Sequence, residues 1–92
     1  MIVRIIGEGQ LDVAESHLDE LNVFDDEIQA ALDRDDERAF RDALAGLLDR
    51  VREVGAPLAP DALEPSDLVL PPEDAHVDDV RALLREDGLI PG

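Results

Sequence analysis

The sequence predicts a small α+β fold in which a short antiparallel sheet packs against helices. Three observations predict it: an apolar β-branched run with a glycine turn, two amphipathic stretches, and a proline-rich segment before a last helical pattern. A chain of 92 residues suits one domain and buries roughly 60–65% of its unfolded surface. We therefore expect a single domain over residues 1–92.

The start of the chain, residues 1–13, predicts a β-hairpin. The run 2–6 is apolar and mostly β-branched, and residues 10–13 alternate between polar and apolar side chains. Gly7 and Gly9 lie between the two runs and favour a tight turn. Because the first run is too apolar for an exposed edge strand, we expect helices to cover one face of the hairpin.

Residues 15–54 predict two antiparallel helices, 15–33 and 37–54. The polar stretch between them is short, and Gly55 followed by Pro57 favours a helix stop. Each helix carries its apolar residues at a spacing of three and four, which places them on one face. In the first helix they are Leu18, Leu21, either Phe24 or Asp25, Ile28 and Leu32, and in the second Phe40, Ala43, Leu44, Leu47, Leu48, Val51 and Val54.

Residues 55–75 contain five of the six prolines and therefore exclude a long helix. Within this segment, residues 67–70 lie between Pro65 and Pro71 and have the length of a short strand. Proline is tolerated at strand ends and on sheet edges, so we expect 67–70 to join the hairpin. The alternative is an extended segment that a partner covers.

Residues 76–92 predict a third helix, over 77–86, and a docked carboxyl-terminal segment. The helix has apolar residues at helical spacing, with Asp74 as the expected N-cap. After Gly88, which suits a helix C-terminus, we expect Leu89 to fold onto Leu84 and Ile90 to pack near the 67–70 strand.

The charge restricts the partners of this protein. There are 24 acids and eight bases, all of them arginines, for a net charge of −16. A chain without a basic stripe is repelled by nucleic-acid phosphates and by anionic lipids, so we expect neither as a direct partner. The acidity fits a GC-rich or salt-adapted genome, or a surface that selects a basic partner. With no cysteine and no apolar run long enough to span a membrane, we expect a soluble, cytoplasmic protein.

No motif in the sequence indicates an enzyme. Gly7 and Gly9 begin like a dinucleotide fingerprint, but Asp12 stands where its third glycine belongs. The acids around residue 35 have calcium-loop spacing but lack the loop's glycine and its last glutamate, and the two histidines have no neighbouring histidine. We predict no catalytic, cofactor-binding or metal-ligating residue.

Three stretches together resemble a known family: "MIVRIIGEGQ" at 1–10, "PSDLVLPP" at 65–72 and "DGLIPG" at 87–92. The chain resembles, over its whole length, the PspA-associated proteins, PspAA, which are small acidic proteins encoded beside the membrane-stress protein PspA. PspA proteins are long coiled-coil-like helices that assemble on membranes. The resemblance implies a non-enzymatic accessory or regulatory role, PspA as partner, and no catalytic residues to transfer.

The leading hypothesis is an adaptor that binds PspA or a related protein, recruited through this partner to the inner face of the membrane. The alternatives are a winged-helix-like transcriptional regulator, which the lack of a basic recognition helix opposes, a domain with another protein partner, and an enzyme, which no feature supports. The predicted partner-binding patch is formed by the two extended segments of the second half of the chain with an acidic rim, and its residues are Asp67, Leu68, Leu70, Glu73, Asp74 and Ile90.

Overall fold

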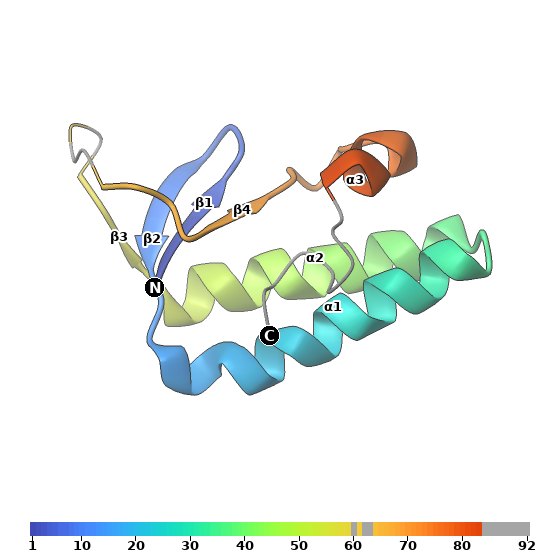
Figure 1. Cartoon of the computed structure of the whole chain (residues 1–92), viewed down its shortest axis with the longest axis horizontal. Helices are drawn as coiled ribbons and strands as arrows, with labels where there is room; N and C mark the ends of the chain where they lie inside the picture. The colour runs from blue at the N-terminus through green and yellow to red at the C-terminus, as the bar shows by residue number, and fades with distance from the viewer. Residues whose placement is uncertain (60, 62–63, 84–92) are drawn as a thin grey trace.

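The computed structural model describes residues 1–59, 61 and 64–83, which form a four-stranded sheet and three α-helices (Figure 1). The α+β class is therefore confirmed. The strand order is β3-β2-β1-β4, which places the amino-terminal strand in the interior of the sheet. The strands are β1 (Ile2–Ile5), β2 (Gly9–Asp12), β3 (Ala56–Pro57) and β4 (Leu68–Leu70).

The predicted hairpin of β1 and β2 is confirmed. The two strands pair antiparallel, with Val3 opposite Leu11 and Ile5 opposite Gly9. Gly7 and Gly9 have φ angles of +88° and +119°, which side chains other than glycine rarely adopt. The turn therefore explains both glycines.

The prediction of a purely antiparallel sheet is wrong, because β4 pairs parallel to β1. Val3 lies opposite Leu68, and Ile5 lies opposite Leu70. After α2 the chain adds the unpredicted β3 to the free edge of β2, then crosses to the opposite edge and enters β4 in the direction of β1. The alternation of apolar residues determines which side chains face the core, but it does not determine strand direction.

The helical hairpin is confirmed with a later start. Residues Glu15–His17 form a 3₁₀ turn, η1, and α1 runs over Leu18–Asp33. Helix α2 runs over Glu37–Val54, as predicted, and the Asp36 side chain accepts a hydrogen bond of 3.1 Å from the backbone N–H of Ala39.

Helix α3 runs over Val77–Leu83. It begins at Val77, so His76 rather than Asp74 precedes it at the N-cap position. The predicted helical residues 84–86, and the contacts predicted for Leu89 and Ile90, lie outside the described residues.

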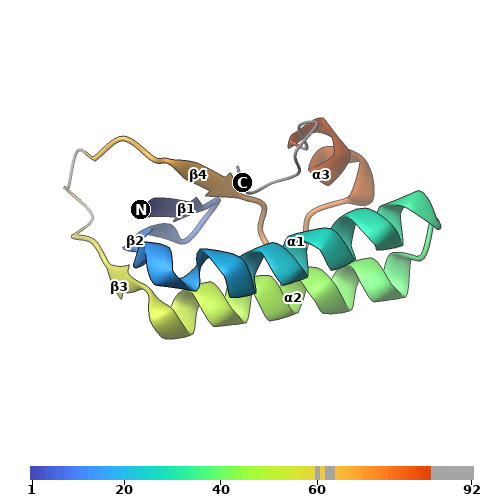
Figure 2. The ribbon, with the colours of Figure 1, turned by 60° about the horizontal axis from the view of Figure 1, so that its bottom comes forward.

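The sheet lies on one side of the α1–α2 hairpin, so the fold has two layers (Figure 2). Alternate strand residues point into the core against the apolar stripes of both helices. The fully buried side chains include Val3, Ile5, Val13 and Leu70 from the strand layer, Leu21 and Ile28 from α1, and Phe40, Leu44, Leu47, Leu48 and Val51 from α2. The core stripe predicted for α2 is therefore confirmed, except that Val54 is only partly buried.

On α1 the structure decides between Phe24 and Asp25. Asp25 is the buried residue, at 1% exposure, whereas Phe24 is partly buried and turns toward α2. Its ring lies against Gly46, where an added Cβ would lie 2.8 Å from the Cε1 atom of Phe24. A larger residue at position 46 would therefore collide with the Phe24 ring.

Candidate partner-binding surface

Asp67 of the predicted patch joins β4 to β1. Its carboxylate oxygen Oδ2 accepts a hydrogen bond of 2.8 Å from the backbone N–H of Ile2, and its own N–H donates to the Ile2 carbonyl at 2.8 Å. Leu68 and Leu70 point into the core and are 4% and 0% exposed, respectively. These two leucines therefore contribute to sheet packing and present no surface to a partner, while Asp67 is exposed but already bonded.

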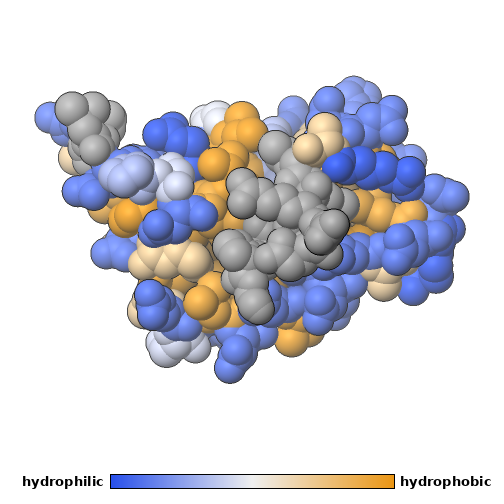
Figure 3. All heavy atoms as spheres, viewed as in Figure 1, coloured by the Kyte–Doolittle hydropathy of each residue, from blue (hydrophilic) through white to orange (hydrophobic). Residues whose placement is uncertain are grey.

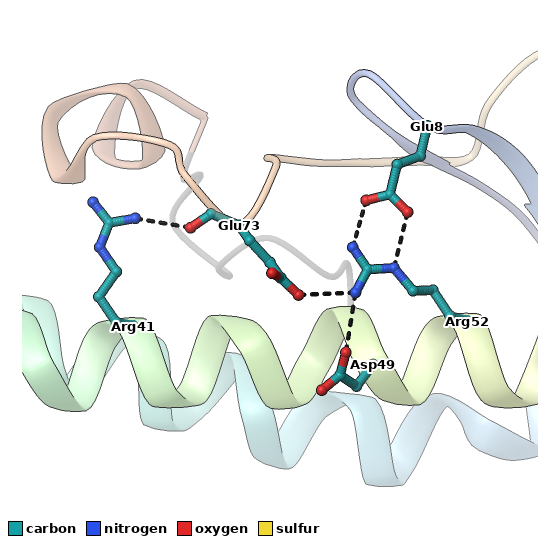
Figure 4. Close-up of polar contacts among 5 residues, drawn as sticks. All are labelled: Glu8, Arg41, Asp49, Arg52 and Glu73. Carbon is teal, nitrogen blue, oxygen red and sulfur yellow. Dashed lines mark hydrogen bonds and ion pairs between the residues drawn. The ribbon is translucent and has the colours of Figure 1, made fainter.

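Glu73 is also engaged within the chain. Its carboxylate accepts a hydrogen bond of 2.9 Å from Arg52, and its backbone carbonyl accepts another of 2.9 Å from Arg41 (Figure 4). Asp74 is exposed and has no ion pair or side-chain hydrogen bond among the described residues. Ile90 lies outside the described residues. Of the six patch residues, only Asp74 is both described and free to meet a partner without breaking a bond.

Arg52 is the centre of a cluster of acids drawn from three parts of the fold. It lies on α2 and contacts Glu8 in the β1–β2 turn, Glu73 after β4, and Asp49 one turn earlier on α2 (Figure 4). Hydrogen bonds from Arg52 hold the pKa of the Glu8 carboxyl below its ordinary value, and the Glu8 contact raises the pKa of Arg52 in turn. The sequence did not reveal this cluster, because its members are far apart in the chain.

A second arginine links the two long helices. Arg50 of α2 donates to both carboxylate oxygens of Glu20 on α1, at 3.1 and 3.2 Å. Hydrogen bonds from Arg50 and, secondarily, from His17 lower the pKa of Glu20. In the described part of the chain most arginines form ion pairs with acids of the same chain, whereas Arg4 and Arg38 are exposed and have none.

A cavity of about 470 Å³ lies beside Arg52 and is lined by residues of β1, β2 and β3 and of the segment that follows β3. Its polar lining includes Arg4, Glu8 and Gln10. Arg52 is already paired with acids, whereas Arg4 is exposed and its only side-chain contact among the described residues is with the neutral Ser66 hydroxyl at 3.4 Å. Within the described residues, no three His, Cys, Asp or Glu side chains are grouped so that they could hold a metal ion.

Three large hydrophobic side chains are exposed among the described residues. Ile6 and Val69 lie at the sheet, with exposures of 43% and 39%, and Val23 lies on α1 at 56%. Figure 3 shows one face of the molecule, where hydrophobic residues appear as patches within a mostly hydrophilic surface. The exposed apolar residues thus fall on two separate surfaces, the sheet beside β4 and the outer side of the helical hairpin.

Comparison with known proteins identifies a family. The family model described as PspA-Associated protein matches residues 1–92, which is the whole chain. The chain belongs to the PspA-associated protein family. No curated protein and no solved structure matches it. For this PspA-associated protein the family resemblance seen in the sequence is therefore confirmed, and the family name points to PspA as the associated protein.

Proposed function

We propose that this protein is a non-enzymatic accessory protein that binds PspA, or a related coiled-coil membrane-stress protein, and modulates the envelope-stress response. The observation that carries the proposal is the family match over the whole chain. A binding role is also compatible with the site geometry, in which the charged clusters are used for internal contacts and apolar side chains remain exposed on two surfaces.

The electrostatics favour a basic protein surface as the partner. The net charge is −16, and the arginines at positions 50 and 52 are each paired with acids of the same chain. Complementary charge speeds association and selects partners, so a helical protein with basic faces suits this surface. Nucleic acid does not, because binding it requires cations that neutralise phosphates.

We also propose a cytoplasmic location, with recruitment to the inner face of the membrane through the partner. Among the described residues, no helix is both long and apolar enough to cross a bilayer. Contact with the membrane through PspA needs no such helix.

Binding is tested with purified PspA from the same organism, immobilised and titrated with this protein at low and at physiological salt. We expect saturable binding that weakens as salt is added, because screening reduces attraction between opposite charges. Absence of binding at low salt, where the attraction is strongest, would contradict the proposal.

The patch proposed from the sequence gives one location for the contact. Its described and exposed acids are Asp67, Glu73 and Asp74, and the apolar side chains beside them are Val69 and Ile6 in place of Leu68 and Leu70. This location remains a prediction, and the experiment in the next subsection tests it against a second surface.

A further inference from the structure

The outer side of the α1–α2 hairpin is a continuous surface that no other described segment covers. The sheet packs on the opposite side of both helices, as Figure 2 shows. Both helices lie entirely within the described residues, over Leu18–Asp33 and Glu37–Val54. Since the core stripes face the sheet, the side chains on the outer side determine what this surface can bind.

A groove of about 370 Å³ runs between the helices on this side. Its walls carry small side chains, and the Phe24 ring lies against Gly46 farther along the same pair of helices. Short side chains let another backbone approach closely, which is a feature of grooves that bind helices. The groove is lined by Glu27, Ala30, Arg34, Ala39, Asp42 and Ala43.

The charges along the groove are mostly acidic and unpaired. Glu27 on α1 and Asp42 on α2 both line it, both are exposed, and neither has an ion pair or side-chain hydrogen bond among the described residues. Arg34 also lines the groove, near the turn between the helices, with Asp36 at 3.9 Å. Cationic side chains of a ligand would therefore lie along the part of the groove away from Arg34.

An exposed apolar residue lies beside the acids. Val23 is 56% exposed and precedes Glu27 by one helical turn, which places the two on the same side of α1. The helix α1 has 16 residues and is therefore about 24 Å long. The outer surface thus offers an exposed apolar side chain, acidic borders and enough length for a partner helix of several turns.

We propose that this groove binds an amphipathic helix of a partner protein, with small or apolar residues along the contact and Lys or Arg on both borders. The inference rests on the proposed function in one respect, the choice of PspA as the partner that supplies the helix. Charge decides between this occupant and a second copy of the chain, because a copy brings 16 further net negative charges and the same acids to the groove.

The first test compares two charge-reversed variants in PspA binding at physiological salt, where exposed charges act over about 8 Å. Glu27→Lys with Asp42→Lys alters the groove, and Asp61→Lys with Asp79→Lys makes the same change in net charge at exposed positions outside both the groove and the patch beside β4. We expect the groove variant to raise the dissociation constant about tenfold or more, and the control variant to raise it about twofold or less. An equal effect of the two variants, or a larger effect of the control, would show that net charge and not the groove governs binding, and would overturn the proposal.

The second test does not depend on PspA. A Lys/Leu amphipathic helical peptide of about 20 residues is titrated into the labelled protein, and amide shifts are followed by NMR. We expect the largest shifts at Val23, Ala30, Ala43 and Gly46, and their loss in the Glu27→Lys, Asp42→Lys variant. The groove proposal would be wrong if the shifts centred on Val69 and Asp74 or were spread evenly over the acids. It would also be wrong if no shifts occurred. A peptide that binds there when PspA does not bind at all would reject only PspA as the partner.

Discussion

Arg52 of α2 holds the β1–β2 turn through a two-point contact with Glu8. Its Nε atom donates to Oε1 of Glu8 at 2.8 Å, and its Nη2 atom donates to the other carboxylate oxygen. The third nitrogen, Nη1, reaches Glu73 and Asp49 at 2.9 and 3.0 Å. One guanidinium thus connects the helical layer, the hairpin turn and the segment after β4.

We expect Arg52→Gln to lower the free energy of unfolding by about 1 kcal/mol at neutral pH, since paired guanidinium contacts are strong but these side chains remain partly exposed and screened. Chemical denaturation measures the change. Arg38→Gln is the matched control, because it removes the same charge from an exposed arginine with no ion pair among the described residues. Equal effects of the two variants would show that only net charge matters.

The Arg52–Glu8 pair also predicts how the stability of the protein depends on pH. Because the pKa of Glu8 in the folded protein lies below its ordinary value of 4.5, its pairing stabilises the fold fully above that value and is lost as the pH falls through the lower folded pKa. The stability difference between wild type and Arg52→Gln, corrected by the Arg38→Gln control, should therefore be constant above the ordinary Glu8 pKa of 4.5 and shrink as the pH falls below it. A difference that stays constant would contradict the assignment.

The contact between Phe24 and Gly46 predicts that the effect of Gly46→Ala on stability changes sign when the Phe24 ring is removed. In the wild type, Gly46→Ala should destabilise the protein, because the new Cβ would lie 2.8 Å from the Phe24 ring. In a Phe24→Ala background the same substitution should stabilise α2 by about 0.5–1 kcal/mol, since alanine is the better helix former. Thermal and chemical unfolding of the four proteins measure the coupling. Stabilisation in both backgrounds would mean that the ring is easily displaced.

Neighbouring residues of β4 should respond very differently to truncation. Leu70 is fully buried and Val69 is 39% exposed on the opposite face of the strand. We expect Leu70→Ala to cost about 2–5 kcal/mol and Val69→Ala less than about 1 kcal/mol. Similar costs for both would show that β4 does not dock on β1 in this register.

Asp67, just before β4, and Asp74, after it, should also differ in how much they stabilise the protein. Asp67→Ala removes the acceptor for the Ile2 N–H and should cost about 1–2 kcal/mol, whereas Asp74→Ala should change stability by less than about 0.5 kcal/mol. The melting temperatures of the two variants test this. Equal melting temperatures would mean that the Asp67 contact contributes no stability.

Salt should stabilise the protein. The net charge of −16 repels itself in the folded state, and added ions screen charges that are more than about 8–10 Å apart. We expect the melting temperature to rise from low salt to molar KCl. A fall would show that pairs such as Arg52–Glu8 outweigh the net repulsion.

Local patterns predicted most of the fold. The α2 stripe gave both bounds of that helix and its buried face, and the glycines at 7 and 9 gave the hairpin turn. Gly55 was correctly placed at the end of α2, but its backbone is extended, and an added Cβ would lie 2.7 Å from the Val51 carbonyl oxygen. The glycine is needed there for space, which sequence spacing does not show.

The candidate site was harder to predict because it depends on distant pairings. The bracketing prolines indicated a strand at 67–70, yet neither its parallel direction nor the burial of Leu68 and Leu70 follows from four residues. The acid Glu73 was indistinguishable in sequence from the other carboxylates until the fold brought Arg52 to it. The sequence placed Asp67, Glu73 and Asp74 alike at the rim, and only the structure shows that Asp74 alone of the three makes no side-chain bond among the described residues.

The interior strand of the sheet is completed by a segment 65 residues away. On a ribosome, β1, β2 and both long helices emerge well before β4, and the helical hairpin and the β-hairpin need only local contacts to form. Closing the remaining loop costs more chain entropy than either hairpin. The nascent chain therefore carries β1 with one unpaired edge until β4 is synthesised, and during that interval the edge is open to strands of other chains.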